Sequence, residues 1–111
     1  MDTPTAEEQL LIATYDKAPY IGSSSASSNG IPFIDFAGKF LIGGATYDPS
    51  VLQGKSADEI AAALSDPTSN ISQGAVGVAN TFTAAICSIT GNQPSRVCSD
   101  PTIQRIKSAL K

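Results

Sequence analysis

The order of apolar and polar positions predicts one short β-hairpin in a chain that is otherwise mostly helical. Residues 31–36 and 39–42 are rich in aromatic and β-branched side chains, which favour strands. Between them lies Ala37-Gly38, where a tight turn needs a positive φ, and Gly38 tolerates that conformation best. The pattern therefore predicts a hairpin over residues 31–43.

A helix is predicted before the hairpin. Thr5 and Glu8 have the spacing of a capping box, in which the hydroxyl accepts a backbone hydrogen bond and the carboxylate reaches back. The helix should end near Asp16, because the residue before Pro19 avoids helical backbone angles. Residues 22–30, GSSSASSNG, have the composition of a flexible linker.

Helical periodicity returns after the hairpin. Asp48, with the proline that follows it, can begin a short helical turn. A second capping box begins at Ser56 and opens another helix. The longest helix is expected from about Asn70 to Ser88, and a last amphipathic helix begins at Pro101. The apolar positions of the longest helix are Ile71, Ala75, Val78, Ala79, Phe82, Ala85, Ile86 and Ile89.

The longest predicted helix contains two glycines, Gly74 and Gly77. Each lowers helix propensity by roughly 1 kcal/mol relative to alanine, so their presence predicts the close approach of another backbone. Polar residues such as Gln73 and Asn80 also interrupt the apolar stretch. A buried central helix is therefore favoured over a transmembrane one, and we expect no membrane span.

These elements predict an α+β fold dominated by helices, four to five in number, with one β-hairpin at 31–43. A length of 111 residues suits a single domain over residues 1–111. Within it we expect an N-terminal helix at 1–21, the Ser/Gly linker at 22–30, and the hairpin with the remaining helices at 31–111.

Composition narrows the classes of function. Hydrophobic residues make up 41% of the chain and charged residues only 15%, so small polar side chains must cover much of the surface, as in secreted proteins. The net charge of −3, without a basic cluster, argues against nucleic acid as a partner. From this surface composition we expect an extracytoplasmic or secreted protein. No basic region followed by an apolar run begins this chain, so its signal peptide is not expected within it.

No residue pattern indicates catalysis. The chain has no histidine, which removes the commonest general base and a preferred zinc or copper ligand, so we expect no metal site. The glycine pairs lack the strand–loop–helix setting of a phosphate cradle, and we expect no cofactor. Asp35 lies in mid-strand, where solvent exposure or a pair with Lys39 explains it better than acid–base chemistry.

Cys87 and Cys98 are the only cysteines. A helix reversed by the intervening turn can bring them within the distance of a structural disulfide, which is the leading interpretation. In the loop-entropy account such a bridge stabilises a fold by roughly 3 kcal/mol, and it suits an oxidising compartment. A redox-active pair and two free buried thiols remain alternatives, although the end of a helix disfavours a reactive thiolate at Cys87.

Pro32 stands at the mouth of the first strand. It has no N–H for a strand ladder, so it must lie at a strand start, at a strand edge or in a cis turn.

Three segments that together span nearly the whole chain carry a resemblance to a known family. They are TPTAEEQLLIATYD, IPFIDFAGKFLIGGATYDPSVLQGKSADEIAAAL and ANTFTAAICSITGNQPSRVC. The chain resembles the C-terminal half of an uncharacterised thioredoxin-like family, number 929 among the domains of unknown function, which is similar to disulfide oxidoreductases. The resemblance implies a partial thioredoxin-like fold with a cis-proline at Pro32. It also implies a redox Cys-x-x-Cys pair upstream, which this chain lacks.

Three functions remain open. The first is a non-catalytic, extracytoplasmic binding or scaffold module, with a candidate peptide-docking edge at Ile31, Pro32 and Phe33 for a peptide or protein partner. The second is a truncated thiol-disulfide oxidoreductase whose Cys-x-x-Cys lies upstream. The third is a structural subunit of a self-assembling surface structure. We also expect a homo-oligomer, formed through the strand edge or through the main helix.

Overall fold

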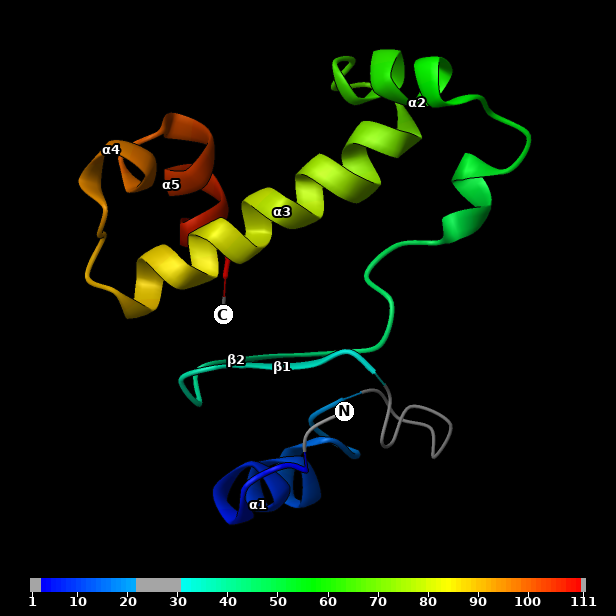
Figure 1. The fold of residues 1–111 in the computed structure, drawn as a ribbon. Coiled ribbons are helices and arrows are strands. Elements are labelled where there is room, and N and C mark those ends of the chain that lie inside the picture. Colours follow the sequence, from blue (N-terminus) through cyan, green and yellow to red (C-terminus); the bar gives the residue numbers. More distant parts are fainter. Residues whose placement is uncertain (1–2, 22–30, 111) are drawn as a thin grey trace. The chain divides into compact units, whose positions relative to one another are not determined.

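The computed structural model describes residues 3–21 and 31–110 and confirms a helix-dominated α+β fold (Figure 1). The chain divides into two compact units, an N-terminal unit (Met1–Ala45) and a C-terminal unit (Thr46–Lys111). The predicted linker at 22–30 lies outside the described residues, and the number of independent domains stays a prediction. The elements are α1 (Ala6–Tyr15), β1 (Phe33–Phe36), β2 (Phe40–Gly43), the 3-10 helix η2 (Pro49–Leu52), α2 (Ala57–Leu64), α3 (Asn70–Ile89), α4 (Ser95–Cys98) and α5 (Pro101–Ala109).

The N-terminal unit begins with α1, whose capping box forms as predicted. The backbone N–H of Glu8 donates to the hydroxyl of Thr5 at 3.3 Å, and the backbone N–H of Thr5 donates to the Glu8 carboxylate at 2.7 Å. No side chain of α1 is fully buried. After the helix, the rings of Tyr15 and Tyr20 meet edge to face with their centroids 5.1 Å apart. The stability of α1 therefore depends largely on local hydrogen bonds and little on the burial of side chains.

The hairpin pairs β1 and β2 in antiparallel register, from Phe33 opposite Gly43 to Phe36 opposite Phe40. Its turn uses positive φ at Ala37 (54°) as well as at the predicted Gly38 (66°). Asp35 accepts a hydrogen bond from the backbone N–H of Gly38 at 2.7 Å. The mid-strand carboxylate therefore holds the turn, a role that its position in the sequence did not indicate.

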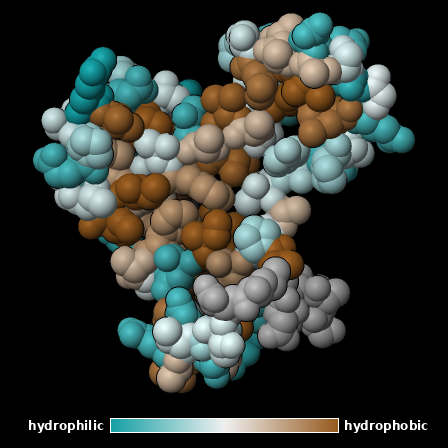
Figure 2. All heavy atoms as spheres, in the orientation of Figure 1, coloured by the Kyte–Doolittle hydropathy of each residue, from teal (hydrophilic) through white to brown (hydrophobic). Residues whose placement is uncertain are grey.

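The C-terminal unit is built along α3. α4 and α5 fold back beside the C-terminal half of α3, and α2 lies at its N-terminal end (Figure 1). Ser69 and Ser72 fix the α2 end through their hydroxyls, which donate to the carbonyls of Ala63 at 2.6 Å and Leu64 at 3.2 Å. Figure 2 shows apolar atoms gathered along the visible face of these helices. No helix in the described part of the chain is long and apolar enough to cross a membrane.

A disulfide lies in the core of this unit, near the C-terminal end of α3. Cys87 on α3 is bonded to Cys98 on α4, with their Cα atoms 5.6 Å apart. Both residues are buried, and they form the core together with Ala84 and Ile103. Ile106 and Leu110 pack against this cluster. The short helix α4, which the apolar pattern did not predict, brings Cys98 back to α3.

The two glycines of α3 differ from the expectation. A Cβ atom at Gly74 would lie 3.2 Å from the side chain of Tyr47, whereas at Gly77 nothing lies within 4 Å. The predicted approach of another backbone is therefore wrong at both positions. Gly74 accommodates an aromatic side chain, and nothing in the structure explains the glycine at position 77.

Candidate functional site

The predicted docking edge comprises Ile31, Pro32 and Phe33. The bond between Ile31 and Pro32 is cis, as the resemblance implied. Two other prolines, Pro19 and Pro94, also follow cis bonds, so this geometry alone does not single out Pro32. The carbonyl of Pro32 accepts a hydrogen bond from Gly44 at 2.8 Å, and Ile31 before it is 86% exposed. The hairpin ladder therefore extends to Pro32, while Ile31 projects beyond it.

One edge of β1 carries backbone groups that the hairpin does not use. In an antiparallel ladder, alternate residues direct their N–H and C=O groups toward the partner strand. Because Pro32 bonds to Gly44, the next residue to face β2 is Ile34, and Phe33 and Asp35 direct their backbone groups outward. The sheet of the described residues has two strands only, so no third strand takes up these groups there.

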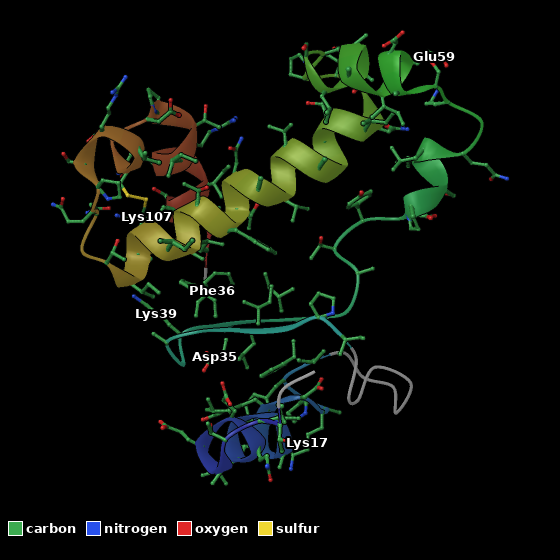
Figure 3. The ribbon with its side chains drawn as sticks, in the orientation of Figure 1. Lys17, Asp35, Phe36, Lys39, Glu59 and Lys107 are labelled. Carbon is green, nitrogen blue, oxygen red and sulfur yellow. A yellow bond between two sulfur atoms is a disulfide. The ribbon has the colours of Figure 1, made fainter. Side chains whose placement is uncertain are left out.

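Side chains of β1 alternate between the two faces of the hairpin. Figure 3 shows Asp35 projecting toward α1 and Phe36 toward the opposite face. Phe33 is two residues from Asp35 and therefore shares the face turned to α1. This face is where α1 and the hairpin meet within the N-terminal unit.

A cavity of about 380 Å³ opens on this face beside β1. Its walls come from the segment that leads into α1, from α1 itself and from the first residue of β1. The described residues that line it are Thr3, Pro4, Glu8, Leu11, Ile12 and Phe33. Phe33 thus belongs both to the outward backbone edge and to the cavity, so a strand added to this edge would pass next to the hollow.

The β2 side of the same face is filled instead. A Cβ atom at Gly43 would lie 2.5 Å from the side chain of Ile21, which is itself buried. Glycine is therefore required there for Ile21 to pack against β2. Because Ile21 covers Gly43 and the cavity lies beside Phe33, the two positions that face each other across the ladder have opposite environments.

The cavity combines apolar walls with a charged rim. The backbone N–H of Thr5, and secondarily its hydroxyl, donate to Glu8 and hold the pKa of that carboxyl below its ordinary value of 4.5. Glu8 is therefore ionised at neutral pH. Asp35 adds a second carboxylate on the same face of the hairpin.

Sequence reasoning predicted a docking edge at Ile31, Pro32 and Phe33 but did not predict the cavity. The adjacent apolar pair Leu11 and Ile12 was a possible signal, because both line the hollow. Their packing partner lies more than 20 positions away, and the helical pattern alone could not identify it. Glu8 was assigned only to capping, and it also lines the cavity.

The cysteines offer no second site. Cys87 and Cys98 are 2% and 0% exposed, and no free cysteine exists in the described chain. A buried disulfide is poorly accessible to an attacking thiolate, which favours the structural interpretation over the redox-active one. Among the residues described, no three potential ligands gather to hold a metal ion.

A polar cavity of about 400 Å³ lies between α3 and the start of α5, with Arg96 and Asp100 on its lining. Asp100 already accepts hydrogen bonds from the backbone N–H groups of Thr102 at 2.8 Å and Ile103 at 3.4 Å. Its carboxylate is therefore used to cap α5. Unlike the cavity beside Phe33, this cavity is not lined by any strand residue.

Comparison with protein-family models, with curated proteins and with solved structures yields no match for this chain. The thioredoxin-like resemblance therefore stays a prediction that rests on the three segments of the sequence. The functional argument depends on the geometry of the hairpin.

Proposed function

We propose that this chain is a non-catalytic, extracytoplasmic binding module that captures an extended peptide of a protein partner along the outer edge of β1. In this mode the peptide adds a strand to the hairpin, and its main chain bonds to the outward N–H and C=O groups of Phe33 and Asp35. The observation that carries the proposal is the coincidence of this open edge with a cavity at Phe33.

The small size of the hairpin supports a need for a further strand. A two-stranded hairpin is marginally stable in water, and a third strand adds both hydrogen bonds and buried apolar area. β1 and β2 contain four residues each. A bound peptide would therefore stabilise the sheet as well as occupy the cavity.

The disulfide supports the proposed compartment. A buried bridge in the core of a unit of this size persists where the environment is oxidising. This supports an extracytoplasmic location. The thioredoxin-like lineage would account for a peptide edge next to a cis-proline, and it remains part of the proposal.

Amide hydrogen exchange on the oxidised chain tests the proposal. The probe is the strongest binder from an array of immobilised random octapeptides, added in solution to 15N-labelled protein. We expect exchange at Phe33 and Asp35 to slow at least about tenfold at saturation, because their amides gain hydrogen bonds. The amides of Leu41 and Gly43, on the outer edge of β2, serve as the internal control and should keep their rates.

Methylated peptides sharpen the test. N-methylation at the residues whose N–H faces β1 should abolish binding, while N-methylation at the residues between them should not, because ladder bonds alternate along a strand. An array without binders, or binding that ignores the alternation, would contradict the proposal.

Self-assembly is a second candidate function, and the chemistry of β2 favours it. A charge or a proline on an edge strand opposes pairing between copies of the same chain, and β1 has Asp35 and Pro32. β2, Phe40–Gly43, has neither. If copies pair through this edge, exchange at Leu41 and Gly43 should slow as protein concentration rises, without any peptide. Peptide capture at β1 predicts no such concentration dependence.

A further inference from the structure

We propose that the cavity beside Phe33 selects a lysine or arginine side chain of the bound peptide. This inference rests on the proposed function and adds the identity of the residue that the site prefers. In an added strand, the peptide residue alongside Phe33 directs its side chain to the same face as Phe33 does. That face contains the cavity, so one peptide side chain enters it.

The walls of the cavity suit a long aliphatic stem. Leu11 and Ile12 supply one side from α1, and Pro4 and Phe33 supply the others. Lysine and arginine bury their methylene stems against apolar surface while their charged ends stay near water. The cavity is open enough at about 380 Å³ to admit such a side chain without rearrangement.

The negative charge at the rim of the cavity favours a cationic group at the end of that side chain. Glu8 lines the cavity, and both the amide and the hydroxyl of Thr5 donate to its Oε2 atom, at 2.7 and 2.8 Å. These bonds fix the carboxylate in place, and no hydrogen bond of the described residues is assigned to its Oε1 atom. A cationic group could therefore approach an anchored acceptor, at little entropic cost to the protein.

A second carboxylate extends the preference along the peptide. Asp35 lies two residues after Phe33 and projects from the same face. The peptide residue two positions from the one in the cavity would pass beside it. The lysines of the N-terminal unit, Lys17 and Lys39, do not line the cavity. Recognition should therefore favour two basic residues with one residue between them.

A lysine scan of the octapeptide identified above tests the inference. The position that enters the cavity is then compared as lysine and as norleucine, which has a similar stem without the charge. On the wild-type protein we expect the lysine peptide to bind about two- to fivefold more tightly, the range of an exposed ion pair. Added salt at 0.5 M should reduce this ratio toward one, because it screens the attraction.

Paired protein variants locate the effect. Glu8→Gln should abolish the lysine preference while keeping the capping box, in which glutamine also serves. Glu7→Gln removes the neighbouring charge, which does not line the cavity, and should leave the preference intact. The inference would be overturned if both variants changed the lysine preference equally. It would also be overturned if the norleucine peptide bound the wild-type protein more tightly than the lysine peptide.

The two proposals fail in different ways. If peptides bind with slowed exchange at Phe33 and Asp35 but show no preference for lysine, the charge selection is wrong and the docking edge stands. If no peptide binds at all, both are wrong.

Discussion

The two units of the chain are stabilised by different means. In the C-terminal unit, α3, α4 and α5 enclose a core of Ala84, Cys87, Cys98 and Ile103, and a disulfide crosses that core. The N-terminal unit has a ten-residue helix without a fully buried side chain and a hairpin of two four-residue strands. Only three of its described residues, Asp16, Ile21 and Phe36, are buried.

This difference indicates a division of labour. The C-terminal helices pack around a shared core with a disulfide, whereas β1 retains outward backbone groups next to a hollow. Segments that bind ligands are commonly drawn from the less stable parts of a fold, because they must rearrange or gain order on binding. On the proposed function, the C-terminal unit would therefore give structural support and the N-terminal unit would bind the peptide.

Removing the disulfide should have the largest effect on this comparison. We expect Cys87→Ala combined with Cys98→Ala to lower the free energy of unfolding by about 3 kcal/mol, because the unfolded chain loses its loop constraint. Urea unfolding followed by circular dichroism at 222 nm measures the change. A reducing agent should mimic the double variant on wild type and do nothing to the variant. A loss below about 1 kcal/mol would contradict the role given to the bridge.

The second-largest effect is expected from removing one capping box in each unit. Thr5→Ala and Ser56→Ala each remove a capping box, at a cost of about 1 kcal/mol to the helix concerned. Amide exchange should accelerate in α1 for the first variant and in α2 for the second. Neither helix has a fully buried side chain, but the hydroxyls of Ser69 and Ser72 hold the C-terminal end of α2 to the start of α3. The folded population of α1 should therefore fall further than that of α2. Equal losses would contradict the ranking of the two units.

Replacing Gly77, a glycine in α3 that no contact explains, with alanine should increase the stability of the protein. Gly77→Ala meets no atom within 4 Å and should stabilise the helix by roughly 0.5–1 kcal/mol. Gly74→Ala gives the same propensity gain but crowds Tyr47 at 3.2 Å, so its net gain should be smaller. Thermal unfolding of both variants measures the difference. If Gly74→Ala stabilised the protein more than Gly77→Ala, another residue would have to contact position 77 in solution, which would contradict this prediction.

The smallest effect is that of pH on the two capping boxes. Backbone hydrogen bonds, from Thr5 and from Ser56 respectively, lower the pKa of Glu8 and of Glu59 below 4.5. A carboxyl with a depressed pKa in the folded state contributes stability above its unfolded pKa and loses that contribution as pH falls through the folded pKa. Both caps should therefore weaken only below about pH 4.5.

Carbon-detected titration of the side-chain carboxyls checks this sign. The midpoints of Glu8 and Glu59 should lie below 4.5 in wild type and rise toward it in Thr5→Ala and Ser56→Ala, each in its own helix. A midpoint of Glu8 that Thr5→Ala leaves unchanged would show that the α1 capping box does not persist in solution.

Local signals in the sequence predicted most of the elements. Capping boxes, proline stops and the 3.6-residue period define α1, α2, α3 and α5 without reference to distant residues. The hairpin was predicted by its turn and by its β-branched and aromatic residues. The bridge between Cys87 and Cys98 was also predicted, because the turn between them is short.

Two missed features, the cavity and the need for glycine at position 43, depend on contacts between segments, whereas the hydrogen bond of Asp35 is local. The cavity needs α1 to lie beside β1, and no periodicity in either segment encodes that pairing. The need for glycine at position 43 likewise arises from Ile21. Asp35 was expected to be exposed or paired with Lys39, yet it binds the Gly38 amide, because positive φ at Ala37 turns the chain back toward it.

Native-state hydrogen exchange of the oxidised chain, without peptide, tests most directly whether the hairpin is the less stable, recognition-ready part. The account predicts that ladder amides such as Ile34 and Ile42 open at a markedly lower free energy than the α3 and α5 amides around Cys87 and Ile103. Hairpin amides that exchange as slowly as those of the disulfide-linked core, or more slowly, would contradict it.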